Sequence, residues 1–325
     1  MDNVNKFQSL IILLMVVIGI MIGQVDIISR YSEDMIMPAL MVMLFLVFVQ
    51  IPLKDITKSF KNRKFTMAAV CINFVWTPIL VFILGKMFLG NSPELLVGFV
   101  MLMVTPCTDW YLIFTGIAKG NVALGASILP LNFILQLLLL PVYIFLIAGS
   151  SVQIDFIDLT QSMIISLFIP LLLATIFRSI VISKKGEEYL EENINPNACD
   201  FQGYFLNLAI VCMFASQGKV LLENPQILLK LLLPVLMFFA INLVVGQFVG
   251  RKIKLSKYDN VALNLTTLAR NSPIALAIAV SAFPDKPLIS LALIIGPLIE
   301  LPVLFIIARV LININEDKFD EKINI

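Results

Sequence analysis

Two hydrophobic segments of the chain are each interrupted near the middle by a proline that lies beside polar and charged residues. The first interruption reads Thr105-Pro106-Cys107-Thr108-Asp109, and the second reads Arg270-Asn271-Ser272-Pro273. Lipid cannot satisfy the backbone groups that an interrupted helix frees, so such breaks persist only where protein or a water-filled cavity meets them. We therefore expect both breaks to face a binding site.

The two breaks occupy matched places in the chain. The apolar segment after each break carries a proline of its own, Pro130 and Pro297, which lies 24 positions beyond Pro106 and Pro273 respectively. Matched breaks in the two halves of a hydrophobic chain are the best sequence indication of the substrate site of a secondary transporter.

Each break carries one charged residue, Asp109 in the first and Arg270 in the second. A charge inside a membrane costs about 2.5–3.5 kcal/mol on insertion scales, so such a residue is a functional candidate by default. If the breaks meet, Asp109 and Arg270 could form a fixed ion pair that pins the crossing. They could equally form a pair whose charge changes when substrate or a proton binds, and the residues alone leave both interpretations open.

Glu300 is a third charge within an apolar segment, and it lies between Pro297 and Pro302. A carboxylate in that environment could exchange a proton during transport. It could instead accept hydrogen bonds from backbone groups near the two prolines.

Cys107 directly follows the proline of the first break. A thiol there is a soft ligand that suits soft metals and metalloids, although a lone membrane cysteine is more often a small packing residue. Thr108, Asn271 and Ser272 flank the breaks and could line a cavity or hydrogen-bond between helices. These four residues are our candidate substrate-binding residues.

The composition decides which elements position these residues. Of 325 residues, 59% are hydrophobic and 14% are charged, whereas about 25% of the residues in a soluble chain are charged. Apolar runs of roughly 20 residues, the length that spans a bilayer, follow one another. The sequence therefore predicts an all-helical integral membrane protein. Nucleic-acid binding is not expected, because the Lys and Arg residues lie in short loops rather than on one face.

Ten transmembrane helices are expected, in one membrane domain over residues 1–325. The expected helices cover 7–23, 35–52, 66–84, 95–118, 122–149, 160–182, 203–217, 227–249, 260–283 and 287–312. Five helices in each half make the halves an inverted repeat, the first over about 1–150 and the second over about 155–315. No small-residue cleavage motif follows 7–23, which we interpret as a helix and not as a signal peptide. Residues 184–202 are expected to form a long polar loop that links the halves.

The distribution of basic residues predicts the orientation. With the N-terminus inside, only Arg30, Lys86, Lys219 and Lys286 fall in outer segments, and most of the 23 Lys and Arg residues fall in inner ones. The positive-inside rule then predicts a plasma-membrane protein with both termini in the cytoplasm.

Several function classes are disfavoured. The chain has no histidine, which removes His-ligated metal sites, histidine proton relays and Ser-His catalysis. Its four cysteines form no C-x-x-C pair that would suggest a zinc site. An intramembrane aspartyl protease would need a second membrane aspartate opposite Asp109, and none is evident. We therefore expect no enzyme, no cofactor and no metal site.

These motifs resemble those of the superfamily that contains the bile acid:sodium symporters and the arsenical-resistance-3 arsenite permeases. Pro106-Cys107-Thr108 resembles the permeases' Ala-Pro-Cys-Thr signature, which contains their essential cysteine. Residues 276–280 and 296–303 resemble the signatures of the last two spans, including the conserved glutamate at Glu300. The resemblance covers all ten spans.

The chain departs from both families at the breaks. The permease signature continues with Ala-Met-Val-Phe-Val-Trp where this chain has Asp109-Trp110-Tyr111, and Asn-Asn-Phe-Glu is expected where it has Asn271-Ser272-Pro273-Ile274. The glutamate and glutamine that bind sodium in the symporters fall on Thr266 and Arg270. A fixed cation where sodium would bind argues against sodium coupling.

The resemblance implies a divergent arsenite-permease relative, with discontinuous helices 4 and 9 crossing at the midplane. A core of helices 3–5 and 8–10 would move against a panel of helices 1, 2, 6 and 7. The implied function is export of arsenite or antimonite by proton exchange. Cys107 would contact the metalloid, and Glu300 and Asp109 would take the proton. Arg270 would take the place of the sodium ion. The alternative is an organic-anion symporter in which Arg270 binds a carboxylate.

Overall fold

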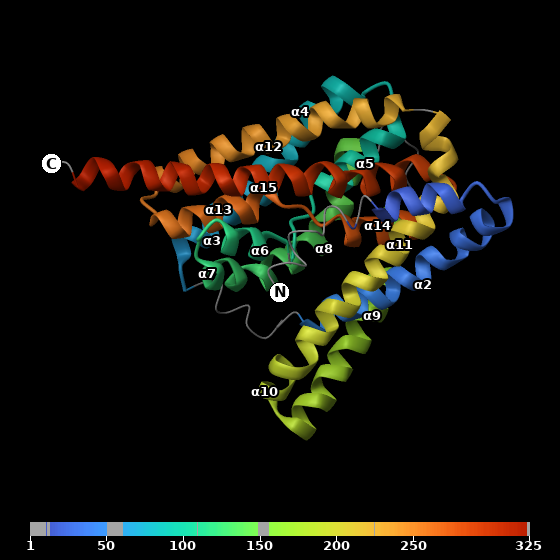
Figure 1. Ribbon diagram of the computed structural model, residues 1–325, viewed down its shortest axis with the longest axis horizontal. Coiled ribbons are helices and arrows are strands. Elements are labelled where there is room, and N and C mark those ends of the chain that lie inside the picture. Colours follow the sequence, from blue (N-terminus) through green and yellow to red (C-terminus); the bar gives the residue numbers. More distant parts are fainter. Residues whose placement is uncertain are drawn as a thin grey trace. The chain divides into compact units, whose positions relative to one another are not determined.

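The computed structural model describes residues 11, 14–50, 61–108, 110–148, 156–223 and 225–323. Over this part of the chain the regular structure is helical, and the β-type pairing that occurs is one isolated antiparallel bridge between Pro106 and Arg270. The helices are α2 (Asp26–Gln50), α3 (Arg63–Cys71), the π-helix η2 (Ile72–Trp76), α4 (Thr77–Leu89), α5 (Pro93–Met103), α6 (Trp110–Ile117), α7 (Val122–Ser127), α8 (Leu129–Ala148), α9 (Phe156–Lys185), α10 (Glu187–Tyr189), the π-helix η3 (Leu190–Ile194), α11 (Asn195–Glu223), α12 (Gln226–Lys252), α13 (Lys257–Leu268), α14 (Ser272–Ala282) and α15 (Pro287–Ile323) (Figure 1).

The expected all-helical membrane class is confirmed. Within the described residues, six helical segments are long and apolar enough to cross a bilayer. They are Asp26–Gln50, Arg63–Leu89, Leu129–Ile147, Glu187–Ser216, Gln226–Lys252 and Pro287–Ile314. Two shorter apolar helices, Pro93–Met103 and Ser272–Ala282, lie beside the two breaks. The ten-helix inverted repeat stays a prediction.

The chain divides into two compact units. The first contains residues 1–52, 153–229 and 273–298, and the second contains 53–152, 230–272 and 299–325. The candidate residues of the two breaks, other than Pro273, belong to the second unit, as does Glu300.

In the first unit, α2 packs against both α9 and α11. Residues 14–22 form a further helical segment that lies against α11. A side chain could not be added at Gly19, because its Cβ would lie 2.7 Å from the carbonyl oxygen of Val211. The absence of a side chain thus allows close approach of the two backbones.

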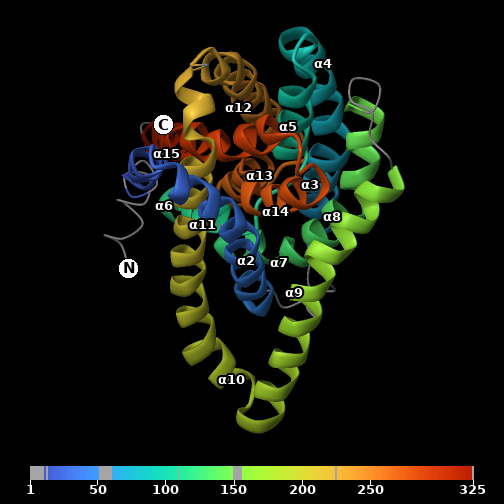
Figure 2. The same ribbon diagram turned by 90° about the vertical axis from the view of Figure 1, so that its right-hand side faces the viewer.

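The expectation of a long polar loop at 184–202 is wrong. The chain stays helical from α9 through α10 and η3 into α11, with a single turn at Gly186, whose φ of 88° favours glycine (Figure 2). Glu187, Glu188, Glu191 and Glu192 made this segment look like a solvated loop, but glutamate is also a good helix former. The segment is the polar end of a helical hairpin.

In the second unit, a π-helical turn separates α3 from α4. Pro78 has no backbone N–H, so the carbonyl of Phe74 four residues earlier lacks its helical donor. The Tyr143 hydroxyl on α8 donates to that carbonyl at 2.6 Å. Single π-helical turns inside α-helices are frequent at functional sites, and this one contains Asn73.

Candidate functional site

The first break leaves helical carbonyls that the polypeptide satisfies locally. Helix α5 ends at Met103, and Pro106 cannot donate to the carbonyl of Leu102 four residues earlier. The Thr105 hydroxyl lies within hydrogen-bond distance of this carbonyl at 3.1 Å and of the Met101 carbonyl at 2.8 Å. The chain can therefore leave the helix without an unsatisfied buried carbonyl at either position.

The second break also frees a helical carbonyl, and backbone groups of the two breaks hydrogen-bond to each other. Pro273 cannot donate to the carbonyl of Ala269, which instead accepts from the backbone N–H of Cys107 at 3.0 Å. In return, the backbone N–H of Asn271 donates to the Thr105 carbonyl at 2.8 Å. These two bonds form the antiparallel bridge between Pro106 and Arg270. The two breaks therefore lie side by side at this bridge, whereas their depth in the membrane stays a prediction.

The Arg270 side chain turns back and caps the end of α13. The last four carbonyls of a helix lack internal donors, and the Arg270 guanidinium donates to two of them, from Nε to Leu268 at 3.1 Å and from Nη2 to Thr267. Its Nη1 donates to the Met103 carbonyl of α5 at 3.0 Å. The C-terminus of a helix carries a partial negative charge, so one cation serves two helix ends.

Other groups complete the surroundings of the guanidinium. Its Nη2 donates to the Asn73 side-chain oxygen at 3.3 Å, and the Asn73 amide donates to the Thr266 carbonyl at 3.2 Å. The ring of Phe238 lies 4.8 Å from the guanidinium carbon, within the range of a cation–π contact. Arg270 is only 1% exposed, so its charge is compensated mainly by protein groups, which include these oxygens and the nearby Glu300.

Glu300 is also at this site, but it meets the backbone of Arg270. Its Oε1 accepts from the Arg270 backbone N–H at 2.7 Å, and the residue is 3% exposed. A charge-assisted bond of this kind is stronger than a neutral one. Protonation of one carboxyl oxygen leaves the other able to accept.

Helix α12 supplies two contacts that the sequence interpretation missed. Asn242 accepts from the Trp76 indole at 2.8 Å and lies 3.5 Å from the Thr267 carbonyl. Phe238 is four positions earlier and therefore lies on the same face of the helix. A lone asparagine within the apolar run 227–249 was a usable signal for Asn242, whereas Phe238 cannot be distinguished by sequence from the other phenylalanines.

The four candidate substrate residues are brought together and buried. Cys107, Thr108, Asn271 and Ser272 are each no more than 4% exposed. The Asn271 amide donates to the Thr108 hydroxyl at 3.2 Å across the two breaks. Asp109 lies outside the described residues, so its pairing with Arg270 stays a prediction.

Two further buried polar side chains, Asn132 and Gln136, lie on α8. The Asn132 amide lies 3.4 Å from the Thr266 hydroxyl, while its own oxygen has no protein partner. Gln136, one turn further along α8, has no protein partner for either amide atom. Both are at most 1% exposed. Buried polar groups are usually hydrogen-bonded, so these two amides are candidate contacts for water or a polar guest.

The chain is similar to known proteins over most of its length. A model described as the Sodium Bile acid symporter family matches residues 37–224, more than half of the chain, including the first break. An arsenical-resistance protein Acr3 of Corynebacterium glutamicum is 26% identical over 262 residues, which cover 77% of this chain and 70% of that protein. Acr3 of Alkaliphilus metalliredigens is 23% identical over 319 residues, covering 91% and 88%. An uncharacterized transporter of Synechocystis sp. is 23% identical over 335 residues, covering 94% and 88%.

Proposed function

Because the chain belongs to the sodium bile acid symporter family, we propose that this membrane transporter exports a trivalent metalloid, arsenite or antimonite, across the cytoplasmic membrane by proton exchange. Similarity to two proteins named for arsenical resistance supports the metalloid class. Its ten helices form two inverted repeats, with helices 4 and 9 crossing at the midplane and both termini in the cytoplasm. Core helices 3–5 and 8–10 move against panel helices 1, 2, 6 and 7.

The observation that carries the coupling proposal is the capping of α5 and α13 by Arg270. Backbone carbonyls, the Asn73 amide oxygen and a nearby carboxylate are the oxygen ligands that a small cation would use. In this chain the guanidinium of Arg270 already occupies the carbonyl and amide oxygens, and the Arg270 backbone N–H donates to the carboxylate. A second cation at the same oxygens would meet both steric exclusion and like-charge repulsion. Arg270 therefore acts as a permanent substitute for a coupling sodium ion.

Cys107 contacts the metalloid. Arsenous acid is a soft electrophile, and attack by the thiol sulfur forms one S–As bond while one hydroxyl leaves as water with the thiol proton. Hydrolysis of that bond reverses the step and releases the substrate. Thr108, Asn271 and Ser272 supply hydrogen-bond partners for the remaining hydroxyl groups.

Glu300 and Asp109 carry the proton. The Glu300 carboxylate keeps its backbone donor from Arg270 in both protonation states. Its charge can therefore change without loss of the contact that positions it.

An organic-anion symporter is the alternative function. In that case Arg270 would direct its guanidinium donors to a substrate carboxylate. Four of its hydrogen bonds instead end on Leu268, Met103, Asn73 and Thr267. A guanidinium has five N–H donors, so most of its capacity is used by the protein, which favours the metalloid proposal.

Everted membrane vesicles from a host without its own arsenite efflux test the proposal. We expect arsenite accumulation driven by an imposed proton gradient, unchanged when choline replaces sodium, and no accumulation of taurocholate. Cys107→Ser vesicles serve as the inactive control. Steep sodium dependence would reject proton exchange, and taurocholate uptake without arsenite uptake would support the organic-anion symporter.

A further inference from the structure

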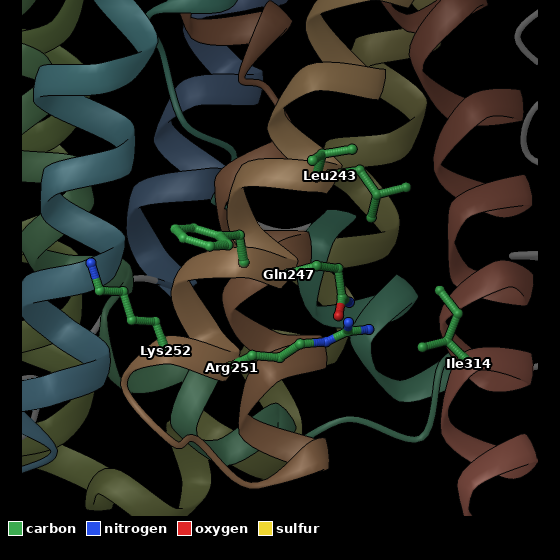
Figure 3. Close-up of a pocket in the computed structure, with 7 residues that line it drawn as sticks. Leu243, Gln247, Arg251, Lys252 and Ile314 are labelled. Atoms are coloured by element: carbon green, nitrogen blue, oxygen red, sulfur yellow. The ribbon is translucent and has the colours of Figure 1, made fainter.

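A groove with a volume of about 810 Å³ lies between α12 and the part of α15 in the second unit, and no residue of either helix break lines it (Figure 3). Its walls are Leu243, Val244, Gln247, Phe248, Arg251, Lys252 and Ile314. Two of these seven residues are cationic and none is acidic. The groove therefore combines an apolar length with a positive end.

The periodicity of α12 arranges these residues in two adjacent rows. Residues four apart lie on one side of a helix, so Leu243, Gln247 and Arg251 form one row. Val244, Phe248 and Lys252 form the other. Each row begins with an aliphatic side chain and ends at a cation in the last turn of α12.

The positive end is held in place by a defined turn between α12 and α13. Leu255 donates through its backbone N–H to the Gly250 carbonyl at 3.0 Å, and Lys254 adopts a φ of 59°. Lys254 and Lys257 bring the number of basic residues between 251 and 257 to four. Cations there also complement the partial negative charge at the C-terminus of α12.

The apolar part of the groove faces outward. Val244 is 68% exposed and Phe248 is 63% exposed, so a hydrocarbon chain can lie along this row. Figure 3 shows Arg251 extending from α12 towards Ile314 of α15, while Lys252 extends along the other side of α12. The ammonium nitrogen of Lys252 lies 5.9 Å from the centre of the Phe248 ring.

We propose that this groove is a binding site for one anionic phospholipid. The phosphodiester lies on Arg251, whose planar fork suits phosphate oxygens, and Lys252 adds positive charge on the side of Phe248. An acyl chain follows Val244 and Phe248 towards the membrane interior. Basic pockets between transmembrane helices on the cytoplasmic side are typical sites for acidic headgroups, and the basic residues favour the cytoplasmic side for this end of α12.

The test compares lipid binding to the purified full-length protein by native mass spectrometry. Delipidated protein is titrated with phosphatidylglycerol or with phosphatidylcholine of the same chains. Arg251→Gln removes the proposed phosphate ligand from an exposed position. Lys184→Gln, in the exposed last turn of α9, removes the same charge from a residue outside the groove and serves as the matched control.

We expect wild type and Lys184→Gln to retain phosphatidylglycerol in preference to phosphatidylcholine, and Arg251→Gln to bind phosphatidylglycerol about fivefold more weakly. Glycerol phosphate, which has the headgroup charge but no chains, should not displace the lipid. Equal retention of both lipids by wild type would overturn the proposal. An equal loss in Lys184→Gln would instead indicate general surface charge, and displacement by glycerol phosphate would indicate a site for a soluble phosphate.

Discussion

The backbone N–H of Arg270 donates a 2.7 Å hydrogen bond to Glu300, while the Arg270 guanidinium points to carbonyls at the ends of α5 and α13. Backbone and side chain of one residue thus serve different partners. The side chain neutralises two helix ends, and the backbone positions a carboxylate. Protonation of Glu300 therefore breaks none of the hydrogen bonds that cap α5 and α13.

This separation predicts that Glu300→Gln folds but loses proton coupling. A glutamine oxygen can still accept from the Arg270 backbone N–H, whereas the amide cannot exchange a proton at physiological pH. We expect wild-type membrane levels, normal counterflow exchange of arsenite, and no arsenite accumulation driven by a proton gradient in vesicles. Retention of gradient-driven accumulation would assign the proton to another group, and Asp109→Asn is the variant to measure next.

The fixed cation predicts chemical rescue at position 270. Arg270→Ala should leave the carbonyls of Met103, Thr267 and Leu268 without a buried donor and destabilise the protein by about 3–5 kcal/mol. Millimolar guanidinium, far below denaturing concentrations, should raise the thermal unfolding temperature of this variant and leave that of wild type unchanged.

Arg309→Ala is the matched control for that rescue. Arg309 is exposed on α15, and its guanidinium lies 5.3 Å from the Phe305 ring. Its loss should cost about 0.5–1 kcal/mol, with no response to guanidinium. A variant at position 270 as stable as wild type without added cation would show that water satisfies these carbonyls.

The breaks were predictable because proline chemistry is local. Pro106 and Pro273 each deny a hydrogen-bond donor to a carbonyl four residues earlier. The matched spacing of the two prolines indicated that the two breaks face one site. The contacts of the Arg270 side chain with α5 and α13 were not predictable, because they depend on where Asn73 and Met103 lie in space.

The missed and mistaken elements have physical reasons as well. Phe238 contacts Arg270 only because α12 turns that face to the break, and its neighbours in sequence are equally apolar. The polar residues of 184–202 favour a loop by composition alone, although glutamate is also a good helix former. A polar composition indicates that a segment contacts water, but it does not distinguish a helix from a loop.

The unpartnered amide of Gln136 predicts a trade-off between stability and transport. Replacing a buried polar group that lacks a partner with an apolar side chain of similar size removes a desolvation cost of about 1–3 kcal/mol. Gln136→Leu should therefore unfold at a higher temperature than wild type. If the polar region beside α13 holds water or substrate during transport, the same variant should transport arsenite more slowly. A lower unfolding temperature would show that water already satisfies the amide, as buried water commonly does.

The last prediction concerns Cys107, which is 1% exposed at the bridge between the two breaks. A single thiol gives a contact with trivalent arsenic that hydrolysis can reverse, whereas several converging thiols would retain the metalloid. Cys107→Ser should abolish arsenite resistance in a sensitive host at wild-type membrane levels, because a hydroxyl is a hard and weak ligand for arsenic. The three remaining cysteines belong to neither break, so Cys71→Ser, Cys199→Ser and Cys212→Ser should each keep most of the resistance. Full resistance in Cys107→Ser would make the thiol a packing group and leave the metalloid to the hydroxyl and amide groups of Thr108 and Asn271. No resistance from wild type at matched expression would remove the metalloid assignment and move the organic-anion symporter ahead of it.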